Sequence, residues 1–252
     1  MNNNMKKEIW NWIAYLWDCL DVMYDIENNS IDLCIIDPPY NVWYKYNWYS
    51  DNMKHQEYIC WQIWILDEIW IKLKQWWSII YITYPELWAE IYTEFLPKRS
   101  YSVASKEIAT WVYNTNLWWK YLRKASRMCV WLSKWEPKNN NITWEYKNPT
   151  DKRIKERIEK WLVPKEVDWF YINQVKNVSK KHNHPCELPQ ELLIKFIKWL
   201  SNEWDLVLDC FSWSWSLWVA CQNTNRQFIM IEKDETYFNI WVERINNLIT
   251  NK

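Results

Sequence analysis

Apolar residues along the chain follow two alternating patterns. Nearly continuous apolar runs that stop at polar residues are typical of strands buried on both faces, and they occur at 13–16, 31–36, 78–83, 206–210 and 228–232. Apolar residues at helical spacing lie between these runs, at 20–26, 55–74, 85–96, 188–200, 217–222 and 234–249. Alternating strands and helices predict an α/β fold with a doubly wound, mostly parallel sheet. Such a sheet binds its ligands at the carboxyl ends of the strands.

The regular pattern is interrupted in the middle of the chain. Two β-rich stretches, 104–113 and 128–133, are separated by a basic loop, and residues 134–181 lose periodicity and gain Asn, Lys and Pro. This composition predicts an inserted recognition region. The polar stretch 41–54 is expected to form a mobile loop over the ligand site. We therefore divide the chain into three parts. Residues 1–97 form the first half of the α/β domain, residues 98–181 hold core strands and the insertion, and residues 182–252 form the second half of the domain.

Charge is unevenly distributed, although Lys plus Arg and Asp plus Glu are equal at 31 each. Residues 98–138 hold nine basic side chains against two acidic ones, and residues 139–185 hold ten against six. A basic middle inside an acidic remainder is expected of a region that faces a polyanion such as nucleic acid. The alternative is a solvated charged face, because the charges over 152–160 also suit an exposed helix with ion pairs four residues apart.

The composition is abnormal, because the chain has no glycine and 25 tryptophans, whereas glycine usually makes up about 7% of residues. Many tryptophans stand where glycine is usual, among them Trp76, Trp77, Trp135, Trp204, Trp213 and Trp215. Our hypothesis is that tryptophan has replaced glycine throughout and that a handful of tryptophans are native, with Trp61, Trp111, Trp131 and Trp169 as the candidates. Positive φ angles at most of the other tryptophans would support it, since glycine adopts them without steric cost. Negative φ angles in regular elements would contradict it.

Cysteine and histidine usage argues against a metal site. The seven cysteines are scattered without a Cys-x-x-Cys pair, and the chain has three histidines. This pattern suits reduced thiols in the cytoplasm. The sequence contains no apolar run of 18 residues and no apolar stretch after its first charges, so we expect neither a membrane span nor a signal peptide.

The first candidate site is the tetrapeptide Asp37-Pro38-Pro39-Tyr40, which follows the apolar run 31–36. Proline fixes φ and has no N–H to donate, so the neighbouring carbonyls are held at defined angles beside a carboxylate and an aromatic ring. This arrangement suits the binding of a flat group that carries an amine. The alternative is a strand followed by a structural Pro-Pro turn.

The second candidate site follows the apolar run 206–210. Asp209 precedes the stretch Phe211-Ser212-Trp213-Ser214-Trp215-Ser216, which would be rich in small residues with glycine at 213 and 215. Small residues before a helix let backbone N–H groups approach a nucleotide-like ligand. Glu232 ends the next apolar run, where an acid typically binds ribose hydroxyls.

The two sites in this order, with His184-Pro185 between them, resemble the beta group of amino-methylating DNA methyltransferases from bacterial restriction–modification systems. The resemblance extends from about residue 13 to 249. It implies a Rossmann-like methyltransferase sheet in which the catalytic half precedes the half that binds S-adenosylmethionine. The region 98–181 would recognise the target sequence.

The resemblance also implies roles for individual residues. The cofactor would contact Asp18, Cys19, His184, Pro185, Asp209, Phe211, Ser212, Trp213, Ser214, Trp215, Ser216 and Glu232. An indole at 213 or 215 would then fill space that the cofactor needs, which predicts that the chain neither folds well nor binds it. The catalytic residues would be Asp37, Pro38, Pro39 and Tyr40. Asp37 and Pro38 would accept the two hydrogens of the target amine, and Tyr40 would stack on a base flipped out of the duplex.

The implied activity is methylation of adenine N6 in double-stranded DNA, because Asp at position 37 leans toward adenine. The alternatives are methylation of cytosine N4, and methylation of RNA or of protein glutamine. Basic side chains are the candidate DNA contacts: Arg123, Lys124, Arg127, Lys180 and Lys181. The resemblance leaves open a homodimer and a cognate restriction endonuclease as partners. It implies a cytoplasmic protein that does not associate with a membrane.

Overall fold

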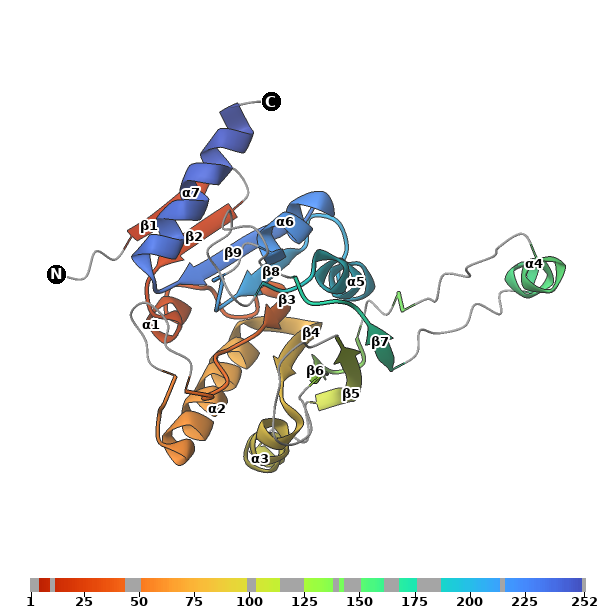
Figure 1. Cartoon of the computed structure of the whole chain (residues 1–252), viewed down its shortest axis with the longest axis horizontal. Coiled ribbons are helices and arrows are strands. Elements are labelled where there is room, and N and C mark those ends of the chain that lie inside the picture. Colours follow the sequence, from red (N-terminus) through yellow and green to blue (C-terminus); the bar gives the residue numbers. More distant parts are fainter. Residues whose placement is uncertain are drawn as a thin grey trace.

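The computed structural model describes residues 5–9, 12–43, 51–98, 103–113, 125–137, 141–142, 151–160, 168–175, 187–213 and 216–250. The strands in this described part form one nine-stranded sheet in the order β1-β2-β9-β8-β3-β4-β6-β5-β7 (Figure 1). Their bounds are β1 Met5–Ile9, β2 Trp12–Leu16, β3 Ile31–Ile36, β4 Leu73–Thr83, β5 Val103–Val112, β6 Ser126–Lys134, β7 Trp169–Tyr171, β8 Leu206–Asp209 and β9 Gln227–Glu232. The central strands β2, β9, β8, β3 and β4 are parallel, which confirms the predicted doubly wound sheet.

Helices cover both faces of the sheet. Their bounds are α1 Cys19–Met23, α2 His55–Lys72, α3 Pro85–Phe95, α4 Lys152–Glu159, α5 Gln190–Leu200, α6 Ser216–Asn223 and α7 Glu235–Thr250, with a 3-10 turn at Leu96–Lys98. Successive residues of a strand point to opposite faces. Cys34 and Ile36 therefore pack with α1, α2 and α3, whereas Leu33 and Ile35 pack with α5, α6 and α7. This two-sided burial explains why the strands read as continuous apolar runs.

One acid interrupts the central strand β3, and its partners account for it. Asp32 is buried, and its carboxylate accepts hydrogen bonds from Lys74 Nζ at 2.8 Å and from the Leu206 backbone N–H at 2.9 Å. Lys74 lies at the start of β4 and Leu206 at the start of β8. The carboxylate therefore ties together the amino ends of three neighbouring strands.

The direction of β6 matters for the site. β6 runs antiparallel to β4 and β5, with Thr83 opposite Met128 and Trp111 opposite Arg127. Its first residues therefore lie at the same edge of the sheet as the carboxyl ends of β4 and β5. This reversal carries Arg127 to the edge where the sequence predicts the ligand site.

Two edge strands were not predicted from the hydrophobic pattern. β1 pairs antiparallel with β2, and β7 pairs parallel with β5. β1 is short and carries Lys6, Lys7 and Glu8, so it lacks an apolar run. β7 has only three residues, and Trp169 and Tyr171 are exposed on either side of the buried Phe170. Edge strands need few buried residues, which is why the pattern did not reveal them.

Positive backbone angles occur at a subset of the described tryptophans. The φ angles are 63° at Trp43, 73° at Trp76, 64° at Trp135 and 69° at Trp204. Trp76 lies where β4 is irregularly paired with β3, and the other three lie outside helices and strands. Most of the other described tryptophans have negative φ and lie in helices or strands, as Trp64 does in α2. The backbone therefore does not support a replacement of glycine throughout the chain.

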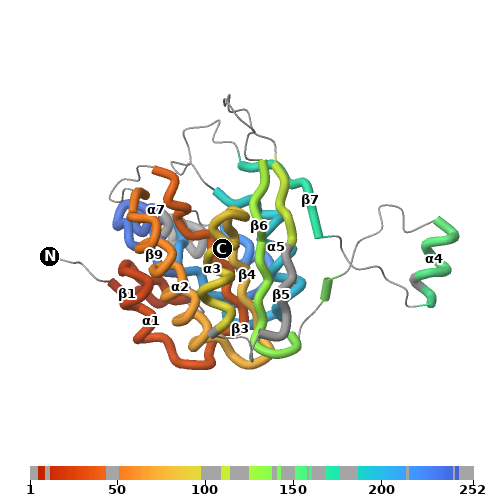
Figure 2. Tube along the Cα trace, turned by 90° about the horizontal axis from the view of Figure 1, so that it is seen from below, coloured from red at the N-terminus to blue at the C-terminus, as the bar shows by residue number. Residues whose placement is uncertain are grey.

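The basic helix α4 lies apart from the sheet, as the two views in Figures 1 and 2 agree. Its sequence is Lys-Arg-Ile-Lys-Glu-Arg-Ile-Glu. It forms an exposed, charged helix, which is the alternative that the charges over 152–160 suggested. The helix falls within the region 98–181 for which we expect target recognition. Among the helices that the structure describes, none combines the length and the apolar composition needed to cross a membrane.

Candidate active site

The two sequence motifs meet at the carboxyl edge of β3 and β8. These strands are adjacent and parallel, with Leu33 opposite Val207 and Cys34 opposite Leu208. The chain continues from β3 to β4 on one side, whereas β8 leads to β9 on the other. Such a switch in direction leaves a crevice at the strand ends, where open α/β sheets bind ligands. Asp37 follows β3 and Asp209 ends β8, so both acids border the crevice.

The tetrapeptide after β3 is held by contacts from its own side chains and from α2. The Tyr40 hydroxyl donates a hydrogen bond to Asp37 Oδ1. The hydroxyl of the buried Tyr58 in α2 donates to the Pro39 carbonyl at 2.8 Å. The tip therefore has a fixed carboxylate and a fixed backbone. Tyr58 was not singled out in the sequence, because it reads as one more apolar position of α2.

The segment after the tetrapeptide is clamped at both of its described ends. The buried Asp51 carboxylate accepts hydrogen bonds from the backbone N–H groups of Asn41 at 2.8 Å and Val42 at 3.0 Å. The Asn41 side chain donates to the Met53 carbonyl at 2.9 Å. The two described ends of the loop expected at 41–54 are therefore bonded to each other, its mobility stays a prediction, and residues 44–50 lie outside the described part.

Burial changes the acidity of the carboxyl groups at this edge. It raises the pKa of Asp37 from 3.8 to about 7, and the nearby Arg127 guanidinium lowers that pKa in turn. Burial also raises the pKa of Asp209 to about 7 and that of Glu232 to about 8, against backbone N–H groups that lower them. Three acids at the ends of three neighbouring strands therefore titrate near neutral pH.

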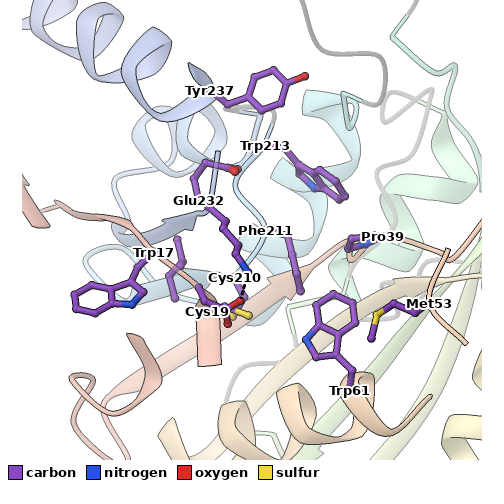
Figure 3. Close-up of a pocket in the computed structure, with 13 residues that line it drawn as sticks. Trp17, Cys19, Pro39, Met53, Trp61, Cys210, Phe211, Trp213, Glu232 and Tyr237 are labelled. Carbon is purple, nitrogen blue, oxygen red and sulfur yellow. Dashed lines mark hydrogen bonds and ion pairs between the residues drawn. The ribbon is translucent and has the colours of Figure 1, made fainter. Parts of the chain in front are cut away.

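A cavity of about 230 Å³ lies beside the tetrapeptide, between the ends of β2, β8 and β9 (Figure 3). Its lining is mainly apolar, with acidic groups at Asp18 and Glu232: Trp17, Asp18, Cys19, Pro39, Met53, Trp61, Cys210, Phe211, Trp213, Ile231, Glu232, Lys233 and Tyr237. Asp18 caps α1 by accepting from the Leu20 N–H at 3.0 Å and pairs with Lys233 Nζ at 2.7 Å. Glu232 Oε1 accepts from the Asp234 N–H at 2.6 Å.

Trp213 joins the two motifs directly. Its indole Nε1 donates to the Asp37 carbonyl at 3.3 Å, across 176 residues of sequence. The ring lies at the wall of the cavity next to Phe211, with 6.3 Å between the ring centroids (Figure 3). The indole therefore forms part of the wall of a cavity that remains beside it, and the expectation that it takes space from the cofactor stays a prediction.

The turn between β8 and α6 is held from several sides. Asp209 Oδ1 accepts from the Phe211 N–H at 2.9 Å, and the Ser212 hydroxyl donates to the Asp209 carbonyl at 3.3 Å. Ser216 begins α6, and its carbonyl accepts from Gln190 Nε2 of α5 at 2.6 Å. These bonds orient the start of α6 toward the crevice.

Several predicted site residues lie outside the described part of the chain, and nothing can be said of their contacts. They are Arg123, Lys124, Lys180, Lys181, His184, Pro185, Ser214 and Trp215. Arg127 is described, and its guanidinium lies over the Tyr40 ring with its Cζ 4.8 Å from the ring centroid. Tyr84, immediately after β4, lies 4.8 Å from Tyr40 between ring centroids. An aromatic residue directly after a predicted strand is the signal that could have identified Tyr84.

A crevice at a switch point, an Asp-Pro-Pro-Tyr tip and an adjoining cavity agree with the comparison to protein families. The model of the DNA methylase family, which comprises N6-adenine and N4-cytosine methyltransferases, matches residues 31–243. The chain belongs to this family. It is therefore an S-adenosylmethionine-dependent DNA amino-methyltransferase, and the match spans both motifs.

Individual relatives of this DNA methylase agree with the assignment. The type II methyltransferase M.HpaI of Haemophilus parainfluenzae is 25% identical over 245 residues, which cover 91% of this chain and 73% of M.HpaI. The type II methyltransferase M1.MboII of Moraxella bovis is also 25% identical over 245 residues, with 88% and 92% covered. Both relatives therefore match along most of their length.

Solved structures show the same fold. The cytosine-N4-specific PvuII DNA methyltransferase superposes with a TM-score of 0.70 at 19% identity, covering 90% of this chain and 84% of that one. The complex of M1.HpyAVI with S-adenosylmethionine gives a TM-score of 0.64 at 20% identity, with 92% and 98% covered. The fold of this DNA methylase is thus shared with both solved structures.

The cavity has the features that S-adenosylmethionine requires. The cofactor combines an adenine, a ribose and a cationic methionine part, which need apolar walls and acidic partners. Phe211, Trp61 and Ile231 supply apolar walls, and Asp18 and Glu232 supply carboxylates. The pKa of the buried Cys19 thiol is raised by burial, so this side chain is a neutral part of the lining. The residues present therefore fit the cofactor that the family uses.

Proposed function

We propose that this methyltransferase modifies the N6 amino group of adenine in double-stranded DNA. The observation that carries the proposal is the Asp37 carboxylate, held beside Tyr40 at the carboxyl end of β3 in a tetrapeptide whose Pro39 lines the cavity. Asp at the first position of the tetrapeptide is the feature that favours adenine over cytosine. The basic region 98–181 supports DNA as the substrate.

The tetrapeptide binds and orients the target amine. The Asp37 carboxylate and the Pro38 carbonyl accept its two hydrogens, which directs the nitrogen lone pair away from the base ring. The Tyr40 ring stacks on the base once it has left the duplex. Rate enhancement then comes from positioning and electrostatics without a covalent enzyme intermediate. The hydrogen bond from Tyr58 to Pro39 supports this role, because it limits movement of the carbonyls.

The cofactor is proposed to bind in the cavity between β2, β8 and β9. S-adenosylmethionine supplies an electrophilic methyl group. Glu232 accepts the ribose hydroxyls, Asp18 accepts the adenine amine, and Asp209 and Phe211 border the methionine part. Cys19, Ser212, Trp213 and Ser216 line or shape the same space, and His184, Pro185, Ser214 and Trp215 complete the predicted set. The predicted homodimer and cognate restriction endonuclease stay predictions.

Nucleoside analysis tests the proposal. The purified protein is incubated with methyl-labelled S-adenosylmethionine and double-stranded genomic DNA that lacks methylated bases, and the DNA is digested to nucleosides. We expect label in N6-methyl-2′-deoxyadenosine, and a loss of about 10²-fold in rate for Asp37→Asn, which removes the carboxylate charge. Asp25→Asn is the matched control, because Asp25 is exposed and lies after α1.

Each other outcome assigns a different activity. Label in N4-methylcytosine would replace adenine by cytosine as the target, since the same arrangement can hold either amine. Parallel incubations with RNA and with a glutamine-containing protein test the remaining alternatives. If no DNA nucleoside carries label while RNA or protein does, the proposal for DNA adenine is wrong.

A further inference from the structure

Arg127 lies in an aromatic enclosure at the active-site edge. Its Cζ is 4.8 Å from the ring centroid of Tyr40, 5.5 Å from that of Tyr84, 5.5 Å from that of Trp111 and 5.4 Å from that of Tyr113. A guanidinium within about 6 Å of an aromatic centroid is attracted to the ring face. Four such contacts hold the guanidinium over the site, rather than extended into solvent where it would meet a DNA phosphate.

The enclosure is built by the topology of the sheet. Tyr40 follows β3, Tyr84 follows β4, and Trp111 and Tyr113 lie at the carboxyl end of β5. Because β6 runs in the opposite direction, Arg127 near its start reaches the same edge and lies opposite Trp111. Trp111 is itself fixed, since its Nε1 donates to the Ile172 carbonyl at 2.8 Å. Three segments therefore supply the rings of the enclosure, and a fourth, β6, supplies the cation.

The Arg127 charge acts on Asp37. Besides Tyr40, which donates to its carboxylate, the groups that interact electrostatically with Asp37 include Tyr81 of β4, Tyr113 after β5, Cys129 and Arg127 of β6, and Asp209 of β8. Burial raises the pKa of the Tyr81 hydroxyl and the Cys129 thiol, and it raises the pKa of Tyr113 to about 12, so these three groups are neutral near pH 7. Arg127 is the cation in this set.

We propose that Arg127 is a positioning residue of the active site, which favours the negatively charged form of the Asp37 carboxyl group and holds the Tyr40 ring in place for the target base. The inference rests on the proposed function, since it assigns Asp37 and Tyr40 to the amine and the base. It differs from a phosphate contact, for which Arg127 is a candidate on charge alone. A phosphate contact would leave the ionisation of Asp37 unaffected.

The first test measures Asp37 directly in the free protein. The side-chain carboxyl carbon of ¹³C-labelled aspartate is followed by NMR over pH, and the Asp37 signal is identified by its loss in Asp37→Asn. We expect Arg127→Met to raise the titration midpoint by about one pH unit, the lower end of the effect of a neighbouring arginine. Arg127→Lys keeps the charge and should leave the midpoint near that of the wild type.

The control is Lys134→Met, which removes a cation from the other end of β6. Lys134 Nζ lies 5.9 Å from the ring centroid of Trp70 and donates to the Leu73 carbonyl, so it is also a cation beside an aromatic ring. Its loss should leave the Asp37 midpoint unchanged. Equal midpoints in wild type and Arg127→Met would overturn the proposal. Thermal denaturation shows whether Arg127→Met is folded. If it is not, Arg127→Gln removes the same charge and keeps a polar side chain.

The second test uses DNA methylation. We expect the acid limb of the kcat profile of Arg127→Met to move to higher pH, with activity about fivefold lower than wild type at pH 7 and recovering toward pH 9. An unmoved acid limb, with a salt dependence of DNA binding reduced by about one charge, would assign Arg127 to a phosphate and overturn the proposal. If the wild type yields no methylated nucleoside, the proposed function fails, and the NMR titration still decides the role of Arg127.

Discussion

Trp204 and Trp64 show how strongly the steric strain at a residue depends on its backbone conformation. Their exposed fractions are almost equal, at 61% and 60%. Trp204 has a φ of 69° in a turn, where its N–H donates to the Asn225 carbonyl at 2.7 Å. Trp64 lies within α2 with a negative φ. A side chain is strained at the first position and tolerated at the second, because only the left-handed conformation brings Cβ against the carbonyl.

The pair therefore predicts opposite effects of glycine. At position 204, Trp204→Gly should be more stable than Trp204→Ala by about 1 kcal/mol, because glycine adopts positive φ without a clash. At position 64, Trp64→Gly should be less stable than Trp64→Ala by about 1 kcal/mol, because glycine is a poor helix former. Urea denaturation of the four variants measures both differences. Greater stability of alanine at position 204 would contradict the strain.

The helix α2 is the element that fixes the catalytic tip. Its Tyr58 hydroxyl donates to the Pro39 carbonyl, and its Gln62 Oε1 accepts from the Tyr81 hydroxyl at 2.8 Å. Its apolar residues pack in the core beneath β3 and β4. The helix therefore supports the tip and the adjacent strand at once. Its periodicity was sufficient to predict its location, whereas its contacts with the tip depend on how it packs across the sheet.

Loss of the Tyr58 hydroxyl should loosen the tip. Tyr58→Phe leaves the ring in place but removes the bond to Pro39, which should lower the free energy of unfolding by about 1–3 kcal/mol. We also expect kcat to fall more than the affinity for S-adenosylmethionine, because the carbonyls that would hold the amine lose a support. DNA methylation assays measure kcat, and calorimetric titration with S-adenosylmethionine measures the affinity for the cofactor. Tyr92→Phe, at an exposed position of α3, is the control and should change neither.

Across the whole molecule, three acids from distant parts of the chain converge at one edge of the sheet. Burial raises the pKa of Asp37 and Asp209 to about 7 and that of Glu232 to about 8. In the unfolded chain these carboxyl groups titrate near pH 4. Between these values the folded protein binds more protons than the unfolded chain, so its stability must fall as the pH rises.

The free energy of unfolding without cofactor should therefore decrease from pH 5 to pH 8. The decrease should exceed about 1.4 kcal/mol, the free energy that corresponds to a tenfold change in the acid dissociation constant of a single group. Asp209→Asn should make the dependence less steep, because it removes one of the three groups. Chemical denaturation at each pH measures the effect. A stability that rises over this range would mean that the three acids are ionised without cost in the folded protein.

Local patterns in the sequence identified the strands and the acids that follow them. β3 and β8 read as apolar runs because both faces are covered, and Asp37, Asp209 and Glu232 stand where such runs stop. The contribution of α2 through Tyr58 could not be predicted, because a tyrosine on the buried face of a helix has the same spacing as any core residue. Asp51 was likewise hidden, since its partners are backbone N–H groups of the segment that follows Tyr40.

The α/β class, the order of the two motifs and the strand ends that carry them follow from the sequence alone, because hydrophobic periodicity and its interruptions are local properties. Which side chains meet at those strand ends is established only by the packing of the strands. The reversal of β6 brings Arg127 into the ring enclosure beside Asp37, and the packing of β8 against β3 brings Trp213 to the Asp37 carbonyl. Such contacts depend on strand order and direction, which residues far apart in the chain establish together.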